Sequence, residues 1–228
     1  MSRIILIFLF FIINFSAISQ DARIITVSFI PTIDDKNVKL DKDIIIDSAK
    51  HYKINISKLK FYVSHLSFYN NEKLVWQDNF AAHLMDAAND MSIKLTIKNK
   101  IDFNAIKFGL GIDSVTNVSG ALDGDLDPLK GMYWTWQSGY VNFKLEGTMP
   151  DKNWANQKFE YHLGGYSGEN NSYNSIVLKT ENSDLINIQL DAGRFLSDWY
   201  VGAHLNIMSP GKIAVDFSKI IASCFIIR

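Results

Sequence analysis

The stretch KLKFYV, residues 58–63, places an apolar side chain at every second position, at Leu59, Phe61 and Val63. Successive side chains of a β-strand point to opposite faces, so a period of two indicates a strand with one buried face. The same alternation returns at Ile93, Leu95 and Ile97, at Val141, Phe143 and Leu145, and at Ile186, Ile188 and Leu190. Short strands cannot bury such faces alone and must pack as a sandwich or barrel. The sequence therefore predicts an all-β fold.

The stretches between these runs contain turn residues, but none is rich enough in Ser, Gly or Pro to separate two domains. A helical spacing of three and four residues occurs only near the end of the chain, after Pro210-Gly211. The residues with this spacing are Ile213, Phe217, Ile220 and Ile221. We expect a short helix there and a closing strand over Phe225–Ile227. The predicted fold is a single-domain antiparallel β-sandwich with a short C-terminal helix.

Residues 1–19 differ from the rest of the chain. Arg3 is followed by the apolar run Ile4–Phe15, and the small residues Ala17 and Ser19 end the segment. This pattern is typical of a secretory signal peptide, and roughly 12 apolar residues are fewer than the ~20 that a spanning helix needs. An uncleaved anchor is the alternative. We expect a signal peptide over 1–19, a mature domain over 20–228 with no membrane span, and a periplasmic, cell-surface or secreted location.

The composition excludes several classes of function. The chain of 228 residues has 23 Lys and Arg against 24 Asp and Glu, which gives no support to nucleic-acid binding. Cys224 is the single cysteine, so an intrachain disulfide or a Cys-rich metal site cannot form, and an exported protein of this kind suits a bacterial periplasm or cell surface. Phosphate-loop, dinucleotide-binding and G-x-S-x-G motifs are absent. We expect no catalytic activity.

The segment Leu122–Gly147 holds the densest set of functional side chains. It begins with three carboxylates at alternate positions, Asp123, Asp125 and Asp127. This spacing resembles the start of a calcium loop, but the closing Glu is missing, so a solvated turn is the alternative. Met132, Trp134 and Trp136 alternate in the same way and would share one face of an extended chain. Two indoles on one face indicate either a packed core or a binding site.

The histidines show no spacing typical of a local metal site, so any site must be assembled by the fold. They are His51, His65, His83, His162 and His204. His65 continues the alternation of residues 59–63, but Leu66 and Phe68 then change phase, which predicts a β-bulge that redirects a side chain. His162 lies just before Gly164-Gly165, where another part of the chain can approach closely. A hydrogen-bonded core histidine is the alternative at that position.

Several blocks together resemble one known family. The block GMYWTWQSGY at 131–140, followed by KLEG at 144–147, resembles the signature of the MbnP-like copper-binding domain. Other blocks of the family are matched by FYVS at 61–64, FGLGIDS at 108–114, LDP at 126–128, HLGGY at 162–166 and IMSPG at 207–211. The resemblance runs from about residue 24 to 215, and the stretch Asp216–Arg228 fits the family poorly.

The resemblance implies an exported, β-rich copper-binding or copper-acquisition protein. Some relatives have a partner di-haem protein of the cytochrome c peroxidase type, which oxidises a Trp to kynurenine, and the kynurenine and two His side chains bind copper. Carried to this chain, the resemblance implies Trp134 or Trp136 as the modified residue and His162 as the first ligand.

The second ligand is left open by the resemblance. In one copper-acquisition relative the ligand His stands two residues after the modified Trp, but here Trp136 holds that position. The candidates for the second ligand are, in order, His65, His204 and His83. The alternative function is a structural or protein-interaction β-sandwich of the cell envelope without a metal.

Overall fold

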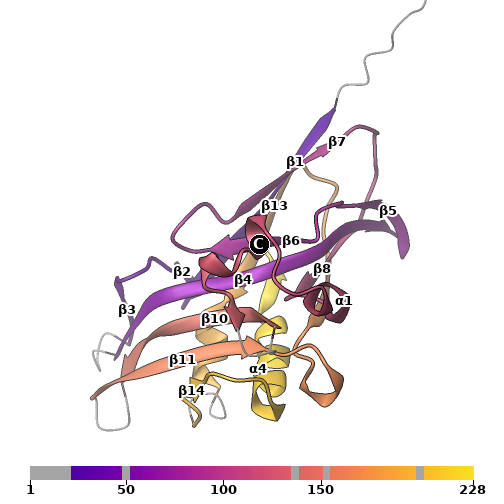
Figure 1. Ribbon diagram of the computed structural model, residues 1–228. Coiled ribbons are helices and arrows are strands. Elements are labelled where there is room, and N and C mark those ends of the chain that lie inside the picture. Colours follow the sequence, from indigo (N-terminus) through magenta and orange to yellow (C-terminus); the bar gives the residue numbers. More distant parts are fainter. Residues whose placement is uncertain (1–21, 48–51, 135–138, 151–154, 199–202) are drawn as a thin grey trace, which may run out of the picture.

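The computed structural model describes residues 22–47, 52–134, 139–150, 155–198 and 203–228 (Figure 1). The predicted signal peptide, His51 and Trp136 lie outside the described residues. Within these ranges the chain is mostly β-strand, and the strands form a five-stranded and a ten-stranded sheet. No helix in the same ranges is both long enough and apolar enough to cross a membrane.

The five-stranded sheet has the order β15-β13-β1-β2, with β7 also paired to β1. Its strands are β1 (Arg23–Ile33), β2 (Lys36–Asn37), β7 (Ser92–Ile97), β13 (Leu185–Asp191) and β15 (Phe225–Ile227). The ten-stranded sheet has the order β12-β8-β4-β10-β11-β14, and β3, β5, β6 and β9 pair at its sides. Its strands are β3 (Asp43–Asp47), β4 (Tyr52–Asn70), β5 (Lys73–Gln77), β6 (Ala82–Asp86), β8 (Ala105–Leu110), β9 (Tyr133–Trp134), β10 (Gly139–Pro150), β11 (Asn156–Gly164), β12 (Asn174–Lys179) and β14 (Asn206–Ile207).

Short helices connect or cover the strands. They are α1 (Ser114–Val118), α2 (Ala192–Ser197), α4 (Lys212–Ala222) and the 3-10 turns η1 (Gly124–Leu126), η2 (Pro128–Lys130) and η3 (Gly168–Asn170). The C-terminal helix and the closing strand are confirmed, since α4 begins right after Gly211 and β15 spans Phe225–Ile227. Buried Phe217 and Ile221 fix α4 to the core.

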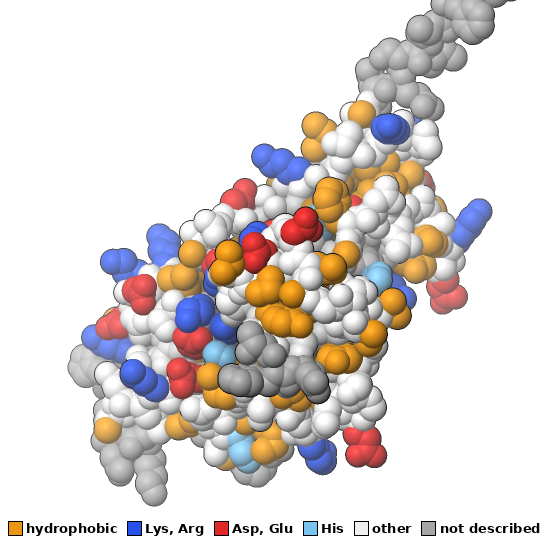
Figure 2. Space-filling view, viewed as in Figure 1, with side chains coloured by type: hydrophobic (Ala, Val, Ile, Leu, Met, Phe, Trp, Pro, Cys, Tyr) orange, Lys and Arg blue, Asp and Glu red, His pale blue; other side chains and the backbone are white. Residues whose placement is uncertain are grey.

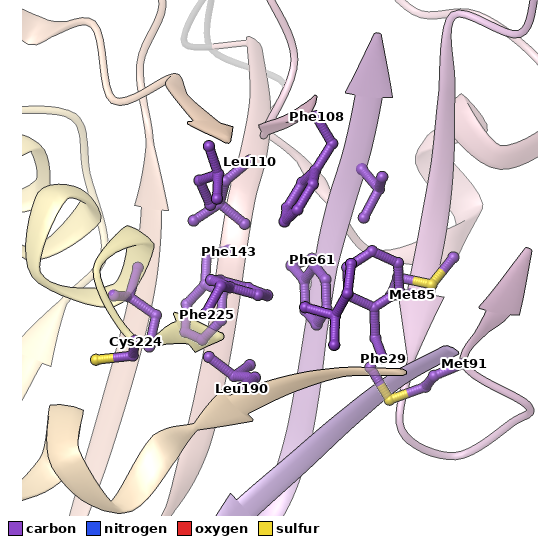
Figure 3. Close-up of a cluster of buried hydrophobic side chains, with 14 of the residues drawn as sticks. Phe29, Phe61, Met85, Met91, Phe108, Leu110, Phe143, Leu190, Cys224 and Phe225 are labelled. Atoms are coloured by element: carbon purple, nitrogen blue, oxygen red, sulfur yellow. The ribbon is translucent and has the colours of Figure 1, made fainter. Parts of the chain in front are cut away.

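The apolar faces of the two sheets meet in one core. Figure 3 shows aromatic side chains from both sheets packed against one another. The ring of Phe29 on β1 lies 5.6 Å from that of Phe61 on β4 and 5.5 Å from that of Phe108 on β8, in edge-to-face geometry. Phe225 of β15 lies 5.6 Å from Phe61 and 6.4 Å from Phe29. The alternation at Leu59, Phe61 and Val63 thus forms the inner face of β4, and the predicted all-β sandwich is confirmed.

Two details of the sheets differ from the prediction or refine it. The sheets are mixed, because β1 pairs with β13 and β11 with β14 in parallel. Alternation is the same in parallel and antiparallel strands, so the sequence pattern could not distinguish the two directions. The predicted bulge is confirmed: the pairing of β4 with β8 shifts between Ser64 and Ser67, and His65 adopts a positive φ of 50°.

A second, smaller apolar cluster covers the opposite, outer face of the ten-stranded sheet. Tyr62 on β4 and Tyr140 on β10 form its base, with their rings 5.7 Å apart, and Met132 and Leu126 cover them. Met132 is fully buried, whereas Trp134 is only half-buried at the edge of this cluster. Met132 and Trp134 both pack on this cluster, and so does Tyr133 between them. This outer layer positions Trp134.

Candidate metal centre

The chain that leads to Trp134 is held at several points. The Asp127 carboxylate accepts a hydrogen bond of 2.8 Å from the backbone N–H of Leu129 at the start of η2. Gly131 then turns the chain with a φ of 73°, a left-handed conformation that favours glycine, and its carbonyl accepts a hydrogen bond from Lys144. Trp134 finally pairs with Gly139 in the β9–β10 ladder. The position of this indole is therefore set by β10.

The indole of Trp134 lies directly on the backbone of β11 at Gly164. A Cβ atom at residue 164 would stand 2.5 Å from Cζ3 of Trp134 and 2.7 Å from the carbonyl oxygen of Tyr140. Only glycine leaves room for the ring there. Residues i and i+2 of a strand share a face, so the side chain of His162 lies on the same face of β11 as this indole. The structure thus places His162 on the face of β11 that the Trp134 indole covers, two residues before the contact at Gly164.

His162 is buried and held by a carboxylate. The side chain of His162 is on the outer face of the sheet, and His162 is only 8% exposed. Its Nε2 lies 2.8 Å from Oε1 of Glu146 on β10. Oε2 of the same Glu146 accepts a hydrogen bond of 2.9 Å from Lys58. Burial would raise the pKa of Glu146, but the hydrogen bonds from Lys58 and His162 outweigh it and lower the pKa. Glu146 is therefore ionised and can only accept, so Nε2 carries the proton.

This arrangement leaves Nδ1 of His162 with its lone pair. Burial lowers the pKa of His162, and the ammonium of Lys144 adds to the effect, against the opposing hydrogen bond to Glu146. The imidazole is thus neutral at neutral pH. Within the described residues Nδ1 makes no hydrogen bond. An imidazole that donates one N–H to a carboxylate and keeps the other nitrogen free is the usual form of a metal-binding histidine.

The close approach at Gly164 leads to a prediction about stability. We expect Gly164→Ala to lower the free energy of unfolding by about 1–3 kcal/mol, because the added methyl group overpacks a contact between an indole and two backbones. Urea unfolding would measure the loss. Ser175→Ala is the control, since Ser175 is exposed on β12 and its side chain bonds none of the described residues. Equal stability of the two variants would contradict the described packing of Trp134.

The lowered pKa of His162 predicts a pH dependence of stability. The unfolded chain protonates this imidazole near its ordinary value of about 6.5, whereas the folded chain does so only at lower pH. Between the two values the unfolded state binds more protons, so the free energy of unfolding falls as pH decreases from about 6.5 and levels off below the folded pKa. His162→Gln should remove this component. Urea unfolding across this pH range would test it, and an identical decline in both proteins would contradict it.

His65 forms a second pair with a carboxylate. The bulge in β4 directs its half-exposed imidazole to Asp113, with Nε2 and Oδ2 2.8 Å apart. Asp113 also caps α1 by accepting the backbone N–H of Thr116 at 2.9 Å. Burial would raise the pKa of Asp113, but the hydrogen bonds from Thr116 and His65 outweigh it, and the pKa is lowered. His65 is thus oriented by the start of α1.

The other two histidines lie on the inner side of the ten-stranded sheet. His83 on β6 pairs across the ladder with Val63, whose side chain is in the core, and its ring is held by Asp78. The ring of His204 lies 6.2 Å from that of Phe217, which packs on the core residue Tyr161. His162 follows Tyr161 and so points to the opposite face. Of the three candidates for a second ligand, His83 and His204 therefore lie on the inner side of the sheet, and His65 does not.

Within the described residues no three His, Cys, Asp or Glu side chains are close enough together to hold a metal ion. Among the three carboxylates of the acidic turn, Asp125 bonds Lys130 at 2.7 Å and the backbone of Leu84 at 3.0 Å, and Asp127 caps η2. Within the described residues these three side chains are not grouped closely enough to hold an ion in this structure. Trp136, the other candidate for oxidation, lies outside the described residues.

Glu146 is the site residue that the sequence analysis missed. It is separated from His162 by a full hairpin, and in the register of β10 and β11 it pairs with Glu160, diagonally next to His162. The sequence did indicate that Glu146 faces outward, because Lys144 and Glu146 alternate with the core residues Phe143 and Leu145. The missing information was the strand register.

Comparisons with known proteins identify the family and the fold of the chain. A family model of MbnP matches residues 22–209. The chain belongs to the MbnP family. The match includes β9, β10 and β11 with Trp134 and His162 and ends before α4, so the C-terminal helix and β15 lie beyond it. The structure of MbnP from Methylosinus trichosporium is similar, with a TM-score of 0.56 and 13% identity over 76% of this chain and 77% of that chain. At this identity the likeness shows the fold alone. No curated protein matches the chain.

Proposed function

We propose that this MbnP family member is an exported copper-binding protein that acts without turnover and holds copper at the face shared by His162 and Trp134. The observation that carries the proposal is the packing of the Trp134 indole on Gly164, on the same face of β11 as a buried neutral histidine whose Nδ1 bonds none of the described residues. Family membership supports a role in copper binding or acquisition, and the predicted signal peptide supports a periplasmic, cell-surface or secreted location.

The chemistry of the residues fits copper in part. Imidazole nitrogen suits copper ions, so Nδ1 of His162 can serve as one ligand. The indole N–H of Trp134 is a donor only and offers no lone pair. Oxidation of the ring to kynurenine with two equivalents of hydrogen peroxide would break the C2–C3 bond of the indole, and hydrolysis would then release C2 as formate. The product is an aniline, whose nitrogen can bind a metal. The proposal therefore includes oxidation of Trp134 by a di-haem partner of the cytochrome c peroxidase type. The second histidine stays open, because the strand registers put His162 level with Lys60, and His65 lies five residues further along β4, roughly 16 Å away.

The surface around Trp134 suits contact with such a partner. Val115 and Val118 on α1 are 81% and 74% exposed, and Leu129 on η2 is 92% exposed. The turn η2 contacts β9, and α1 contacts β10, so these apolar side chains flank the strand that carries Trp134. Figure 2 shows hydrophobic side chains in the middle of this face and charged side chains of both signs beside them. Exposed apolar groups of this kind often mark protein contact surfaces.

A co-expression experiment tests the proposal. The mature chain from Gln20 is produced with and without a di-haem peroxidase of the cytochrome c type, loaded with Cu(I) and dialysed. Copper content and the mass of the peptide that contains residues 133–144 are then measured. We expect about one copper per chain and the mass increase of kynurenine at Trp134 in the partner-treated protein, by analogy with mononuclear imidazole sites. Trp134→Phe is the matched variant and should lose both.

The alternative is a structural or protein-interaction β-sandwich without a metal. It is favoured by the absence of three grouped metal-binding side chains in the described ranges. Under this alternative, no preparation of the chain retains copper. The variant His162→Ala binds other ligands as the unsubstituted chain does. No copper and no change in mass after treatment with the partner would reject the copper proposal and leave this alternative. Kynurenine at Trp136 instead of Trp134 would also overturn the assignment of the site.

A further inference from the structure

A cleft of about 1030 Å³ lies between β5 and β7, and none of its lining residues belongs to the site around Trp134. We call it the β5–β7 cleft. One wall is Lys73–Trp76 of β5, the other is Lys94–Ile97 of β7 and the loop that follows it to Asp102. Figure 1 shows β5 and β7 at the same end of the molecule. The cleft therefore lies where the edges of the two sheets open.

Both walls of the β5–β7 cleft are edge strands. In the part of the chain that the structure describes, β5 pairs only with β4, and β7 pairs only with β1. Each strand thus keeps one row of backbone N–H and C=O groups outside the ladders. An extended chain can add to such an edge as a further strand through main-chain hydrogen bonds. A free edge therefore favours a ligand with a peptide backbone.

The lining of the cleft carries more positive than negative charge, with four Lys against two Asp. The four lysines are exposed and are Lys73, Lys94, Lys98 and Lys100. None of them has an ion pair within the described residues. The carboxylates of the lining, Asp78 and Asp102, bond His83 and Asn182 instead. The whole chain has a formal net charge of −1, so this local excess of positive charge is not a general property of the surface.

The cleft also offers apolar surface between the charges. Leu74 is 46% exposed and Phe80 is 71% exposed, and Trp76 lies half-buried beside them, its ring 5.5 Å from that of Phe68. Successive side chains of an added strand would point alternately toward this apolar floor and toward the lysines. A ligand that alternates apolar and acidic side chains would match both.

We infer that the β5–β7 cleft binds an extended acidic segment of a partner protein, which adds as a strand to β5 or β7 and pairs its carboxylates with the four lysines. The free edges supply the backbone hydrogen bonds, and the lysines select the charge. Lysines on edge strands also hinder pairing with uncharged or basic strands, which narrows the range of partners. The cleft and the copper proposal rest on different residues, so each can fail without the other.

Fluorescence anisotropy with a labelled eight-residue peptide of alternating Val and Glu tests the inference on the mature chain. We expect saturable binding that weakens as salt is raised, because exposed charge pairs are screened. The double variant Lys94→Glu/Lys98→Glu should lower the affinity by at least about tenfold, since attraction becomes repulsion. The control Lys158→Glu/Lys219→Glu changes the charge equally on exposed residues outside the cleft and should change affinity by less than about twofold.

Two further probes separate backbone addition from simple charge attraction. A peptide with Pro in place of Val carries the same charge but cannot extend a ladder, so it should not bind. Binding of the Pro peptide as tight as that of the Val peptide would overturn the inference, as would equal loss in the control variant. A sulfated oligosaccharide that binds while the Val peptide does not would assign the cleft to a polysaccharide and would likewise overturn it.

Discussion

Replacement of His162 by alanine is expected to reduce the copper affinity of the partner-treated chain by more than about 100-fold, because loss of a ligand exceeds the 10–100-fold effect of losing an outer-shell partner. The imidazole is buried and neutral, and Glu146 fixes its orientation. Alanine supplies no nitrogen to replace Nδ1 as a ligand. Chelator competition would measure the change. Affinity within about twofold of the unsubstituted chain would contradict the assignment of His162 as a ligand.

Glu146→Gln tests the same site without removing the ligand. The amide keeps the size of the side chain but loses the charge that fixes the proton on Nε2, so a fall of about 10-fold to 100-fold in copper affinity is expected. Loss of the carboxylate should also lower the pKa of His162 further, because its hydrogen bond raises that pKa in the native chain. NMR titration of the His162 imidazole would measure this fall in its pKa. Glu72→Gln, exposed in the turn between β4 and β5, is the control and should change neither quantity.

Phe61→Ala is expected to lower the free energy of unfolding by about 3–5 kcal/mol, the usual cost of a large cavity in a packed core. Phe61 is 0% exposed, and its ring lies between those of Phe29, Phe143 and Phe225 at 5.6, 6.1 and 5.6 Å. Rings from both sheets meet there, so the cavity cannot collapse easily. Urea unfolding measures the loss.

The control for this prediction is an equally large aromatic side chain at the surface. Phe80 is 71% exposed, and Phe80→Ala should change stability by no more than about 0.5 kcal/mol. A loss below about 1 kcal/mol in Phe61→Ala would mean that the two sheets do not pack through this residue as described.

The sequence pattern predicted four core strands of the sandwich, its C-terminal helix and closing strand, and one of its irregularities. Alternation at residues 59–63 identified β4, and the change of phase after His65 identified the bulge, because both depend only on which residues must face the core. The spacing after Gly211 identified α4 for the same reason. Parallel pairing of β1 with β13 was not predictable, since strand direction leaves no trace in a pattern of period two.

The candidate site was predictable only through resemblance. Trp134 and His162 were named by matching blocks, but their placement on one face of β11 depends on the β9–β10 and β10–β11 registers and on the absence of a Cβ at Gly164. The same registers place Glu146 diagonally next to His162, which no local spacing could indicate. The position of His83 on the inner face is likewise set by its pairing with Val63, and its rank among the ligand candidates could not be judged from sequence.

The most direct test of the account is the copper affinity of one preparation of the mature chain before and after oxidation of Trp134 by the di-haem partner. The account predicts that affinity rises by at least about tenfold on oxidation, because the indole offers no lone pair and its product does. The increase should vanish in Trp134→Phe and in His162→Ala. Equal affinity before and after complete conversion of Trp134 would contradict the proposed copper site.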